Sequence, residues 1–416
     1  MTERLAVARM GKFGDGICET PNGALYIPYA LPGEIVTVEQ WPGHPDRRHL
    51  VGVEIASPER VAPICPHFGV CGGCLLQHWD LGPYRKWKRT LVIEALARAG
   101  LDAPVLEFID AHGEGRRRVV LHARPGPRHL LEVGFSARKS HHVVAIDHCP
   151  VLAPSLRDAI ATAWSVAEQI ANGCKPLDIQ ITAAQTGLDV DVRGSGPLSP
   201  MHVARLAEVA RRQRLARLTR HGEIVARRAA PMVSIGRARV ELPPGAFLQP
   251  TTAGEKVLAQ LVETHCAGCM NVADLFCGIG PFALRLAERA PVRAVDYDAA
   301  AIGALRRAAE TTPGLKPVVA QARDLFARPL IPDELKPFDA VVFDPPRQGA
   351  EAQARALAAC AVRRVVAISC NPTTLARDAR ILVDGGYRLL DVTPVDQFLY
   401  STHVEVVARL ERASVG

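Results

Sequence analysis

A single cysteine near the end of the chain combines a nucleophilic side chain with a position that suits catalysis. Cys370 follows the apolar, β-branched run from Arg364 to Ser369, which predicts a buried strand, and Thr373 and Thr374 predict the start of a helix. Unsatisfied N–H groups at a helix N-terminus carry partial positive charge and favour a thiolate over a thiol. The pattern therefore predicts a reactive thiol at Cys370, with an inert buried cysteine as the alternative.

Four further cysteines have the pattern of a metal or cluster site. Cys65, Cys71 and Cys74 share one short segment, and Cys149 lies far along the chain, directly before Pro150. Four thiolates hold either a zinc ion or an iron–sulfur cluster. Structural zinc sites usually pair two C-x2-C knuckles, whereas this set has one. Its longer gap, its glycines and its Cys-Pro ending favour a 4Fe-4S cluster.

Length, charge and cysteine count narrow the class of protein. The chain has 416 residues, of which 48% are hydrophobic, and this is enough for two or three domains that each bury a core. The net charge of +7 weakly favours a polyanionic partner such as nucleic acid. We expect a cytoplasmic protein outside the membrane, because residues 1–10 lack an apolar signal segment and no stretch approaches about eighteen uninterrupted apolar residues. Eleven cysteines, an odd number, argue against a disulfide framework.

Three segments with different patterns must position these residues. Residues 1–57 hold short strand-like runs separated by glycine and proline, which predict a small OB-like β barrel able to bind RNA. Residues 58–240 mix strands and helices, which predicts an α+β domain whose helix near residues 84–100 packs with the C-terminal segment. Its basic runs at residues 85–89 and 116–118 could contact phosphates or could be solvated surface charges. Residues 241–416 alternate strands and helices, which predicts a doubly wound parallel sheet.

The expected elements follow from hydrophobic periodicity. In the middle segment we predict strands at residues 117–123, 129–135, 142–146 and 177–192, and helices at residues 84–99 and 156–171. In the last segment we predict strands at residues 272–276, 292–296, 317–321, 340–344, 364–369, 387–392 and 403–410. Ligands of such sheets bind beyond the carboxyl ends of the parallel strands, so those ends are where a site is expected.

The first two of these strand ends have the character of a nucleotide site. A glycine loop, residues 274–282, ends the first strand, and Asp296 ends the second, where a carboxylate can accept hydrogen bonds from ribose hydroxyls. The G-x-G-x-x-G pattern of a dinucleotide site is absent. The loop instead resembles the S-adenosylmethionine loop of class I methyltransferases. This resemblance places Asp324 near the adenine and Asp344 to Arg347 beside the methyl group.

The last strand ends favour uracil as the target of methylation. Arg347 follows Asp-Pro-Pro where enzymes that methylate exocyclic amines often carry an aromatic residue, and the second cysteine of RNA cytosine-5 methyltransferases is absent. Carbon 5 of uracil becomes nucleophilic only after a thiolate adds to carbon 6, and Cys370 lies where that thiolate is needed. A general base must then remove the carbon-5 proton. We predict Glu405, which strand alternation places on one face with His403; a solvent-exposed glutamate is the alternative.

These residues together resemble the RNA uracil-5-methyltransferase family, and most closely its branch that modifies 23S rRNA and carries a TRAM domain and a 4Fe-4S cluster. The resemblance rests on Gly14 to Gly16, Ala30 to Glu34, the cluster cysteines, Phe247 to Gln249, Asp274 to Gly280, Asp344 to Arg347, Ser369 to Pro372 and Asp396 to Glu405. It implies an α/β fold class: a C-terminal Rossmann-like class I methyltransferase domain, an N-terminal TRAM barrel and a central α+β domain with the cluster.

The resemblance also assigns roles to individual residues. It implies that S-adenosylmethionine is bound by Gln249, Phe276, Asp296, Asp324 and Asp344, that the cluster is held by Cys65, Cys71, Cys74 and Cys149, that Cys370 is the nucleophile and that Glu405 is the base. Thr251, Pro281 and Asp296 depart from the family pattern, so the contacts to the methyl donor are expected to be rearranged.

Two other functions remain open. The tRNA-specific branch of the family lacks the TRAM segment and the cluster cysteines, which makes 23S rRNA the expected partner. A non-catalytic iron–sulfur protein that binds RNA or senses oxidation is the alternative from another class, and the presence of both Cys370 and Glu405 argues against it. We expect a monomer without an obligate protein partner.

Overall fold

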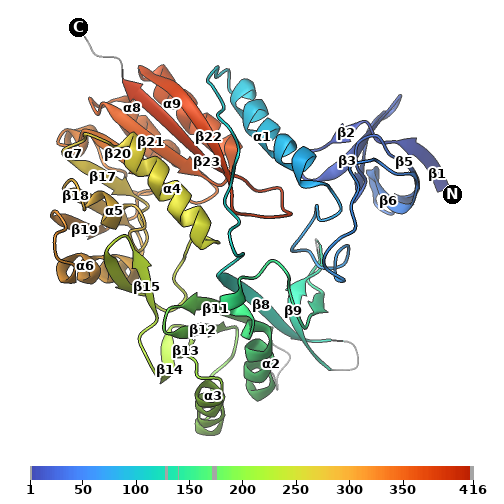
Figure 1. Ribbon diagram of the computed structural model, residues 1–416, viewed down its shortest axis with the longest axis horizontal. Helices are drawn as coiled ribbons and strands as arrows, with labels where there is room; N and C mark the ends of the chain where they lie inside the picture. Colours follow the sequence, from blue (N-terminus) through green and yellow to red (C-terminus); the bar gives the residue numbers. More distant parts are fainter. Residues whose placement is uncertain (1, 127–129, 139, 171–175, 413–416) are drawn as a thin grey trace.

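The structure is a computed structural model, and it describes residues 2–126, 130–138, 140–170 and 176–412. Three β-rich regions follow one another along the chain, and Figure 1 shows them as a blue N-terminal region, a green middle region and a yellow-to-red C-terminal region. The predicted α/β fold class is confirmed. The domain boundaries at residues 57 and 240 remain predictions. None of the helices among the described residues is long and apolar enough to cross a membrane.

The N-terminal region is a small sheet of six short strands, in the order β1-β5-β6-β4-β3-β2. The strands are β1 (Thr2–Ala6), β2 (Arg9–Met10), β3 (Asp15–Thr20), β4 (Gly23–Pro28), β5 (Ile35–Trp41) and β6 (His44–Ile55). The long strand β6 pairs with β5 on one side and contacts β4 on the other, so it joins the two halves of the sheet. Val7, Ile27 and Val36 belong to its own buried core. The β-rich N-terminal unit is therefore present as expected.

The middle region is a seven-stranded sheet in the order β10-β9-β8-β11-β12-β13-β14. Its strands are β8 (Arg118–Pro125), β9 (Leu131–Ser136), β10 (Val143–Ala145), β11 (Leu177–Ala184), β12 (Gly187–Arg193), β13 (Arg217–Arg220) and β14 (Glu223–Arg227). Two helices, α2 (Ala159–Ile170) and α3 (Pro200–Arg212), pack against it, and a single 3-10 turn, Pro154–Leu156, precedes α2. A hairpin, β15 (Met232–Ile235) and β16 (Ala238–Glu241), leads out of this region.

The predicted strand at residues 177–192 was wrong as a single element. The chain turns between β11 and β12, which pair antiparallel as a hairpin. Gly187, with φ of 125°, adopts a backbone conformation that other residues rarely reach, so it permits the turn. His129 of another predicted strand and Ala171 of a predicted helix lie outside the described residues.

The C-terminal region is an eight-stranded sheet in the order β19-β18-β17-β20-β21-β23-β22-β7. Its strands are β7 (Ile109–Asp110), β17 (Val272–Leu275), β18 (Val292–Asp296), β19 (Val318–Ala322), β20 (Ala340–Phe343), β21 (Arg364–Ser369), β22 (Tyr387–Asp396) and β23 (Glu405–Arg412). The strands from β17 to β21 pair in parallel, and β23 runs antiparallel between β21 and β22. The doubly wound parallel sheet is thereby confirmed.

Helices cover both faces of this sheet, as a doubly wound fold requires. The buried side chains of one face come from α1 (Leu81–Arg98), α7 (Pro332–Leu335), α8 (Glu351–Ala358) and α9 (Pro372–Asp384). Those of the other face come from α4 (Thr252–His265), α5 (Ala283–Leu286) and α6 (Ala299–Thr311). The first of these helices, α1, comes from the middle segment of the sequence and lies along α9 beside the sheet (Figure 1). Strand β7 also comes from that segment and extends the sheet next to β22.

A buried ionic cluster attaches these middle-segment elements to the end of β22. Lys88 of α1 donates to Asp396 at 2.7 Å, and neither side chain is exposed to solvent. Tyr84 donates to the same carboxylate, and His112 lies 3.1 Å from it. Hydrogen bonds and charge interactions with His112 and Lys88 hold the pKa of Asp396 below its usual value in spite of burial. The residues that follow Asp396 are therefore held in a fixed position.

Candidate active site

One cavity of about 450 Å³ lies at the carboxyl ends of the parallel strands. The loop after β17 contributes the glycine segment, and the ends of β18, β20 and β21 contribute Asp296, Asp344 and Cys370. Because β23 is antiparallel to β21, its first residue, Glu405, reaches the same edge. The structure thus brings together the predicted site residues Gln249, Phe276, Asp296, Asp344, Cys370 and Glu405.

Asp324 is the predicted site residue that does not line this cavity. Its carboxylate accepts hydrogen bonds from the backbone N–H groups of Phe326 and Ala327, and these bonds close the turn after β19. The ring of Phe326 lies 5.3 Å from the ring of Phe276, measured between centroids, and Phe276 does line the cavity. In this structure Asp324 therefore shapes the loop beside the cavity.

The glycine loop and Asp296 form the rim of the cavity on the side of β17 and β18. Asp296 accepts hydrogen bonds from the backbone N–H groups of Gly278 and Asp298, each at 2.9 Å. Gly278 has φ of 52° and open space where a Cβ would lie, so the backbone is accessible to a ligand here. Phe276 also adopts a positive φ, of 60°, which is strained for a residue with a side chain. Such strain at a cavity wall is common at binding sites.

Two of the positions that depart from the family pattern line the cavity, and one does not. Pro281 and Asp296 lie in the wall. Thr251 is the N-cap of α4, because its hydroxyl accepts from the N–H of Gly254 and donates to the carbonyl of Ala111. Its difference from the pattern therefore concerns the start of a helix and leaves the cavity wall unchanged.

A chain of hydrogen bonds joins Asp344 and Glu405 in the cavity wall. Gln249 donates through Nε2 to Asp344 at 3.1 Å, and Gln397 donates through Nε2 both to Oε1 of Gln249 at 2.7 Å and to Oε1 of Glu405 at 3.2 Å. Burial raises the pKa of Asp344 to about 7. Burial and the charge of Asp344 raise the pKa of Glu405 to about 8. The cavity therefore holds proton acceptors that titrate close to neutral pH, as general bases require.

Cys370 lies directly before α9, as expected, but the predicted cap and the predicted thiolate were wrong. The helix begins at Pro372, and the N-cap is Asn371, whose side chain accepts from the N–H of Thr373. Burial and the charges of Glu405 and Asp344 raise the pKa of the Cys370 thiol to about 11, although Arg347 opposes the shift. Loss of solvation outweighs the helix N-terminus here. These surroundings favour the thiol form of Cys370 over the thiolate.

Arg347 is a functional candidate to which the sequence assigned no catalytic role. It lines the cavity and hydrogen-bonds the Cys370 thiol, which lowers the pKa of that thiol. His403 receives a 3.0 Å hydrogen bond from Arg347 at Nε2, and since arginine can only donate, this nitrogen carries no proton. Burial and the charge of Arg347 lower the pKa of His403 to about 4. His403 therefore orients Arg347 and, unlike Glu405, does not line the cavity.

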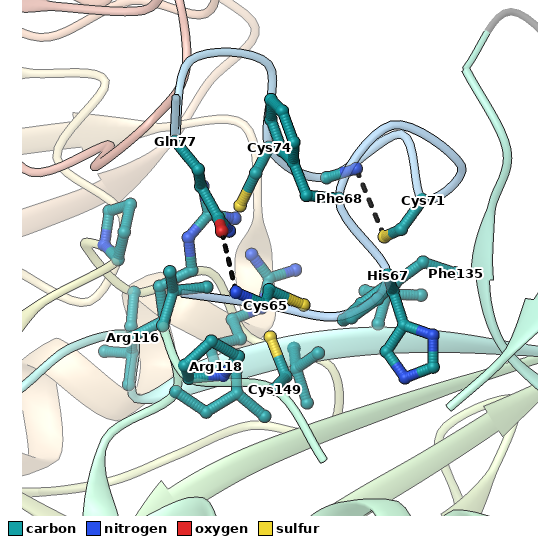
Figure 2. Close-up of a pocket in the computed structure, with 18 of the residues that line it drawn as sticks. Cys65, His67, Phe68, Cys71, Cys74, Gln77, Arg116, Arg118, Phe135 and Cys149 are labelled. Carbon is teal, nitrogen blue, oxygen red and sulfur yellow. Dashed lines mark hydrogen bonds between the residues drawn. The ribbon is translucent and has the colours of Figure 1, made fainter. Parts of the chain in front are cut away.

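A second cavity, of about 350 Å³, holds the four clustered cysteines. Cys65, Cys71 and Cys74 come from the loop before α1, and Cys149 comes from the loop before the 3-10 turn; Figure 2 shows them around one space. The backbone N–H of Cys65 is fixed by the side-chain oxygen of Gln77 at 3.1 Å, and the N–H of Gly73 points at the sulfur of Cys71 (Figure 2). The fold thus gathers the predicted set from two distant segments.

The spacing of these thiols can be compared with the spacing of four thiolates around a zinc ion. Four thiolates around zinc, each about 2.3 Å from the metal, stand about 3.8 Å apart. Among the described residues, no three of these sulfurs come within 4.8 Å of one another; the group that does is formed by His67, Asp147 and His148. Burial raises the pKa of Cys149 to about 11, and the charges of the other three cysteines add to the shift, so the four side chains face each other. The four thiols thus surround one cavity, and their spacing is wider than the spacing of thiolates around a bound zinc ion.

The two cavities share a wall. Phe247, Leu248 and Pro250, from the segment between β16 and α4, line both of them. Arg118 of β8, which lines the cysteine cavity, stacks over the ring of Phe247 at 5.6 Å. Gln249, which donates to Asp344, lies in the same segment.

The fold and the strand-end cavity define a class I methyltransferase. A solved tRNA (uracil-54, C5)-methyltransferase from Pyrococcus abyssi, in complex with S-adenosyl-L-homocysteine, has the same fold, with a TM-score of 0.76, 22% identity and coverage of 98% of this chain and 99% of that chain. The family model for tRNA (Uracil-5-)-methyltransferase matches residues 319–413.

Curated relatives match almost the whole chain. An uncharacterised RNA methyltransferase from Brucella suis is 45% identical over 99% of this chain and 98% of its own length. A 23S rRNA (uracil(1939)-C(5))-methyltransferase from Chromohalobacter salexigens is 34% identical over 98% of this chain and 89% of its own length. The chain therefore belongs to the RNA uracil-5-methyltransferase family, and it is an RNA methyltransferase.

Proposed function

We propose that this enzyme transfers the methyl group of S-adenosylmethionine to carbon 5 of a uracil in 23S rRNA, through a covalent adduct between Cys370 and carbon 6. The observation that carries this proposal is the meeting of Cys370 and Glu405 in one cavity with the glycine loop. A nucleophile, a base and a nucleotide-binding loop are the three parts that the reaction needs. All of them come from one chain, which is consistent with activity as a monomer.

The methyl donor occupies the glycine-loop side of the cavity in this proposal. Asp296 accepts hydrogen bonds from the ribose hydroxyls, Phe276 packs against the adenine, and Gln249 and Asp344 lie toward the methyl-bearing sulfur. Asp324 acts through the loop that carries Phe326. The positive charge of the sulfonium stabilises the ionised forms of Asp344 and of the Cys370 thiol, so donor binding lowers the pKa of both groups.

The chemical steps balance with these residues and water. The Cys370 thiol first loses its proton to water, and the resulting thiolate adds to carbon 6 of uracil. The electron pair of the 5,6 double bond moves to give an enolate that is nucleophilic at carbon 5. Carbon 5 takes the methyl group, and S-adenosylhomocysteine leaves. Glu405 then accepts the carbon-5 proton, the 5,6 double bond re-forms, and the bond between sulfur and carbon 6 breaks to release the Cys370 thiolate.

The choice of 23S rRNA rests on the relatives. The Chromohalobacter salexigens relative, named for a uracil of 23S rRNA, matches nearly the full length of this chain at 34% identity. The similarity to the Pyrococcus abyssi tRNA enzyme lies in the fold, at 22% identity. We therefore propose rRNA as the substrate and tRNA as the second candidate.

Comparison of RNA from a wild-type strain and a strain that lacks this protein tests the substrate. Nucleoside analysis of separated 23S rRNA and tRNA should show that one 5-methyluridine disappears from 23S rRNA and that tRNA is unchanged. Restoring the gene should restore the modification, and restoring a Cys370→Ala version should not. If 5-methyluridine is lost from tRNA instead, the proposed substrate is wrong although the enzyme class stands.

We further propose that Cys65, Cys71, Cys74 and Cys149 hold a 4Fe-4S cluster. The meeting of the four cysteines in one cavity supports a bound group there, and the single C-x2-C pair in their sequence spacing favours the cluster over a zinc ion. When bound, the cluster would link the loop before α1 to the loop before the 3-10 turn, and the shared wall would carry this support to Gln249. The cluster would thereby help to hold the wall segment, residues 247–250, which closes one side of the active-site cavity.

Anaerobic purification should yield a brown protein with about four iron ions and about four sulfide ions per chain, because this is the composition of a 4Fe-4S cluster. Cys149→Ser should lose most of the iron and should lower the thermal unfolding midpoint, since it removes one of the ligands. Cys360→Ala, at a buried cysteine far from this cavity, is the matched control and should keep the iron. A colourless protein with stoichiometric zinc would show that the cluster assignment is wrong.

A further inference from the structure

Gln397 has a place in the site that neither the sequence pattern nor the comparisons explain. It follows Asp396 at the end of β22 and is 1% exposed, yet it does not line the cavity. Its two amide hydrogens are both used, one for Oε1 of Gln249 and one for Oε1 of Glu405. A buried polar side chain placed between two residues of an active site invites a functional explanation.

The direction of these hydrogen bonds is determined by the partners. The amide nitrogen of Gln249 donates to Asp344, so its oxygen must face Gln397 as an acceptor. An ionised Glu405 offers only acceptors. Gln397 must therefore present its NH2 group to both, and the side chain of a hydrophobic residue of the same length would leave both acceptors without that donor.

Gln397 leaves one oxygen of Glu405 unoccupied. Among the described residues, Oε2 of Glu405 is buried and has no hydrogen-bond partner, while Oε1 is held by Gln397. Since Glu405 lines the cavity together with Cys370, its unpartnered oxygen is available to accept a proton from carbon 5 of a bound uracil.

The position of Gln397 is itself fixed by the backbone of α4. A Cβ added at Gly254 would lie 2.2 Å from Oε1 of Gln397 and 2.9 Å from its Cβ. The absence of a side chain at residue 254 thus lets the helix approach and confine the amide. On the other side, the buried Lys88–Asp396 pair holds the preceding residue.

We infer that Gln397 is a positioning residue for the last step of the reaction, holding Oε1 of Glu405 so that Oε2 accepts the carbon-5 proton of the methylated adduct. This inference rests on the proposed function. The bonds made and broken are those of the release step: the proton moves from carbon 5 to Oε2, and the carbon–sulfur bond to Cys370 breaks. Gln397 itself gains and loses no proton.

The inference predicts that Gln397→Met separates adduct formation from adduct release. Met has a similar length without a hydrogen-bond donor. With RNA from a strain that lacks the protein, methyl transfer into a covalent protein–RNA adduct should occur, and release of the methylated RNA should slow by about tenfold or more, on the scale of losing part of a general-base contribution. Denaturing gels should therefore show the adduct accumulating with this variant and not with the wild type.

The pH dependence of product release should change if Gln397 positions Glu405, and it should not change if Gln397 has only a structural role. Gln397 and Arg347 stabilise the charged form of Glu405, whereas burial and the charge of Asp344 destabilise that form. Cys370 is the other titratable group nearby. Loss of Gln397 should raise the pKa of Glu405 further. Because release needs the ionised carboxylate, the pH at which release reaches half its maximum should move upward in Gln397→Met.

Two controls separate this role from misfolding. Gln353→Met makes the same change at a buried glutamine of α8 that pairs with the backbone of Leu330, and it should leave release and its pH profile unchanged. RNA from the same strain grown with 5-fluorouracil should form a stable adduct with both Gln397→Met and the wild type, because a fluorine at carbon 5 cannot be removed as a proton. Gly254→Ala, which displaces Gln397 without changing it, should slow release in the same direction.

The outcomes distinguish the inference from the function on which it rests. If neither the wild type nor Gln397→Met forms the fluorinated adduct, the covalent mechanism is wrong. If both form it and Gln397→Met releases normal product at the wild-type rate and with the wild-type pH profile, Gln397 has no positioning role. Failure of Gln397→Met alone to form the fluorinated adduct would also overturn the inference, since the variant would then act before the release step.

Discussion

Replacement of Cys370 by alanine is expected to abolish methyl transfer, by about 10⁴-fold or more, because removal of a covalent nucleophile costs on this order. Without the thiolate, carbon 5 of uracil remains a poor nucleophile and cannot attack the methyl group. The side chain lies at the cavity wall and its loss leaves Asp296 and Gln249 in place, so binding of S-adenosylmethionine should persist. Transfer of a labelled methyl group to RNA from a strain that lacks the protein measures the loss, and calorimetry measures donor binding.

The control for this variant is Cys360→Ala, which removes a buried thiol outside the cavity. It should retain methyl transfer close to the wild-type rate. Wild-type turnover by Cys370→Ala would rule out the covalent mechanism, and loss of donor binding together with activity would assign Cys370 to the donor pocket instead.

Replacement of Glu405 by glutamine is the second large effect that we expect. The amide keeps the size of the side chain but cannot accept the carbon-5 proton, so the methylated adduct should form and persist. Turnover should fall by about 10²- to 10⁴-fold, the usual range for a general base. A protein–RNA adduct that resists denaturation and carries labelled methyl should accumulate.

The pH dependence of the wild type should reflect the same carboxylate. Burial and the charge of Asp344 raise the pKa of Glu405 to about 8, so release should speed up as the pH rises through this region and the carboxylate ionises. Glu405→Gln should lose this dependence. Prompt release of methylated RNA by Glu405→Gln would show that another group removes the proton.

The sequence predicted the sheet and most of the cavity because both depend on local patterns. A parallel strand buried on both faces is a continuous apolar run, and the residue that follows such a run lies at the edge where ligands bind. This logic led to Asp296, Asp344 and Cys370 and extended to Glu405 at the start of an antiparallel strand. The structure places all four in one cavity.

The features that sequence reasoning missed depend on contacts between distant segments. The pKa of Cys370 is set by burial and by two carboxylates from other strands, and neither effect is visible in the turn that suggested a thiolate. The role of Gln397 depends on its hydrogen bonds to Gln249 and Glu405, which lie in two other segments of the chain. The packing of the helix near residues 84–100 with the C-terminal domain was expected, whereas the buried pair of its Lys88 with Asp396 was not.

The shared wall gives the cysteine cavity a physical connection to methyl transfer. Segment 247–250 closes one side of each cavity, and its Gln249 begins the hydrogen-bond chain that ends at Glu405. The proposed cluster would therefore lie beside the segment that carries Gln249.

Mass spectrometry of the enzyme after reaction with fluorouracil-containing RNA tests the central claim most directly. The account predicts a single modified peptide in which Cys370 carries one nucleotide with both the fluorine and a transferred methyl group. A modified peptide that contains a different cysteine, or methylated RNA formed by an enzyme that never yields this adduct, would contradict the account.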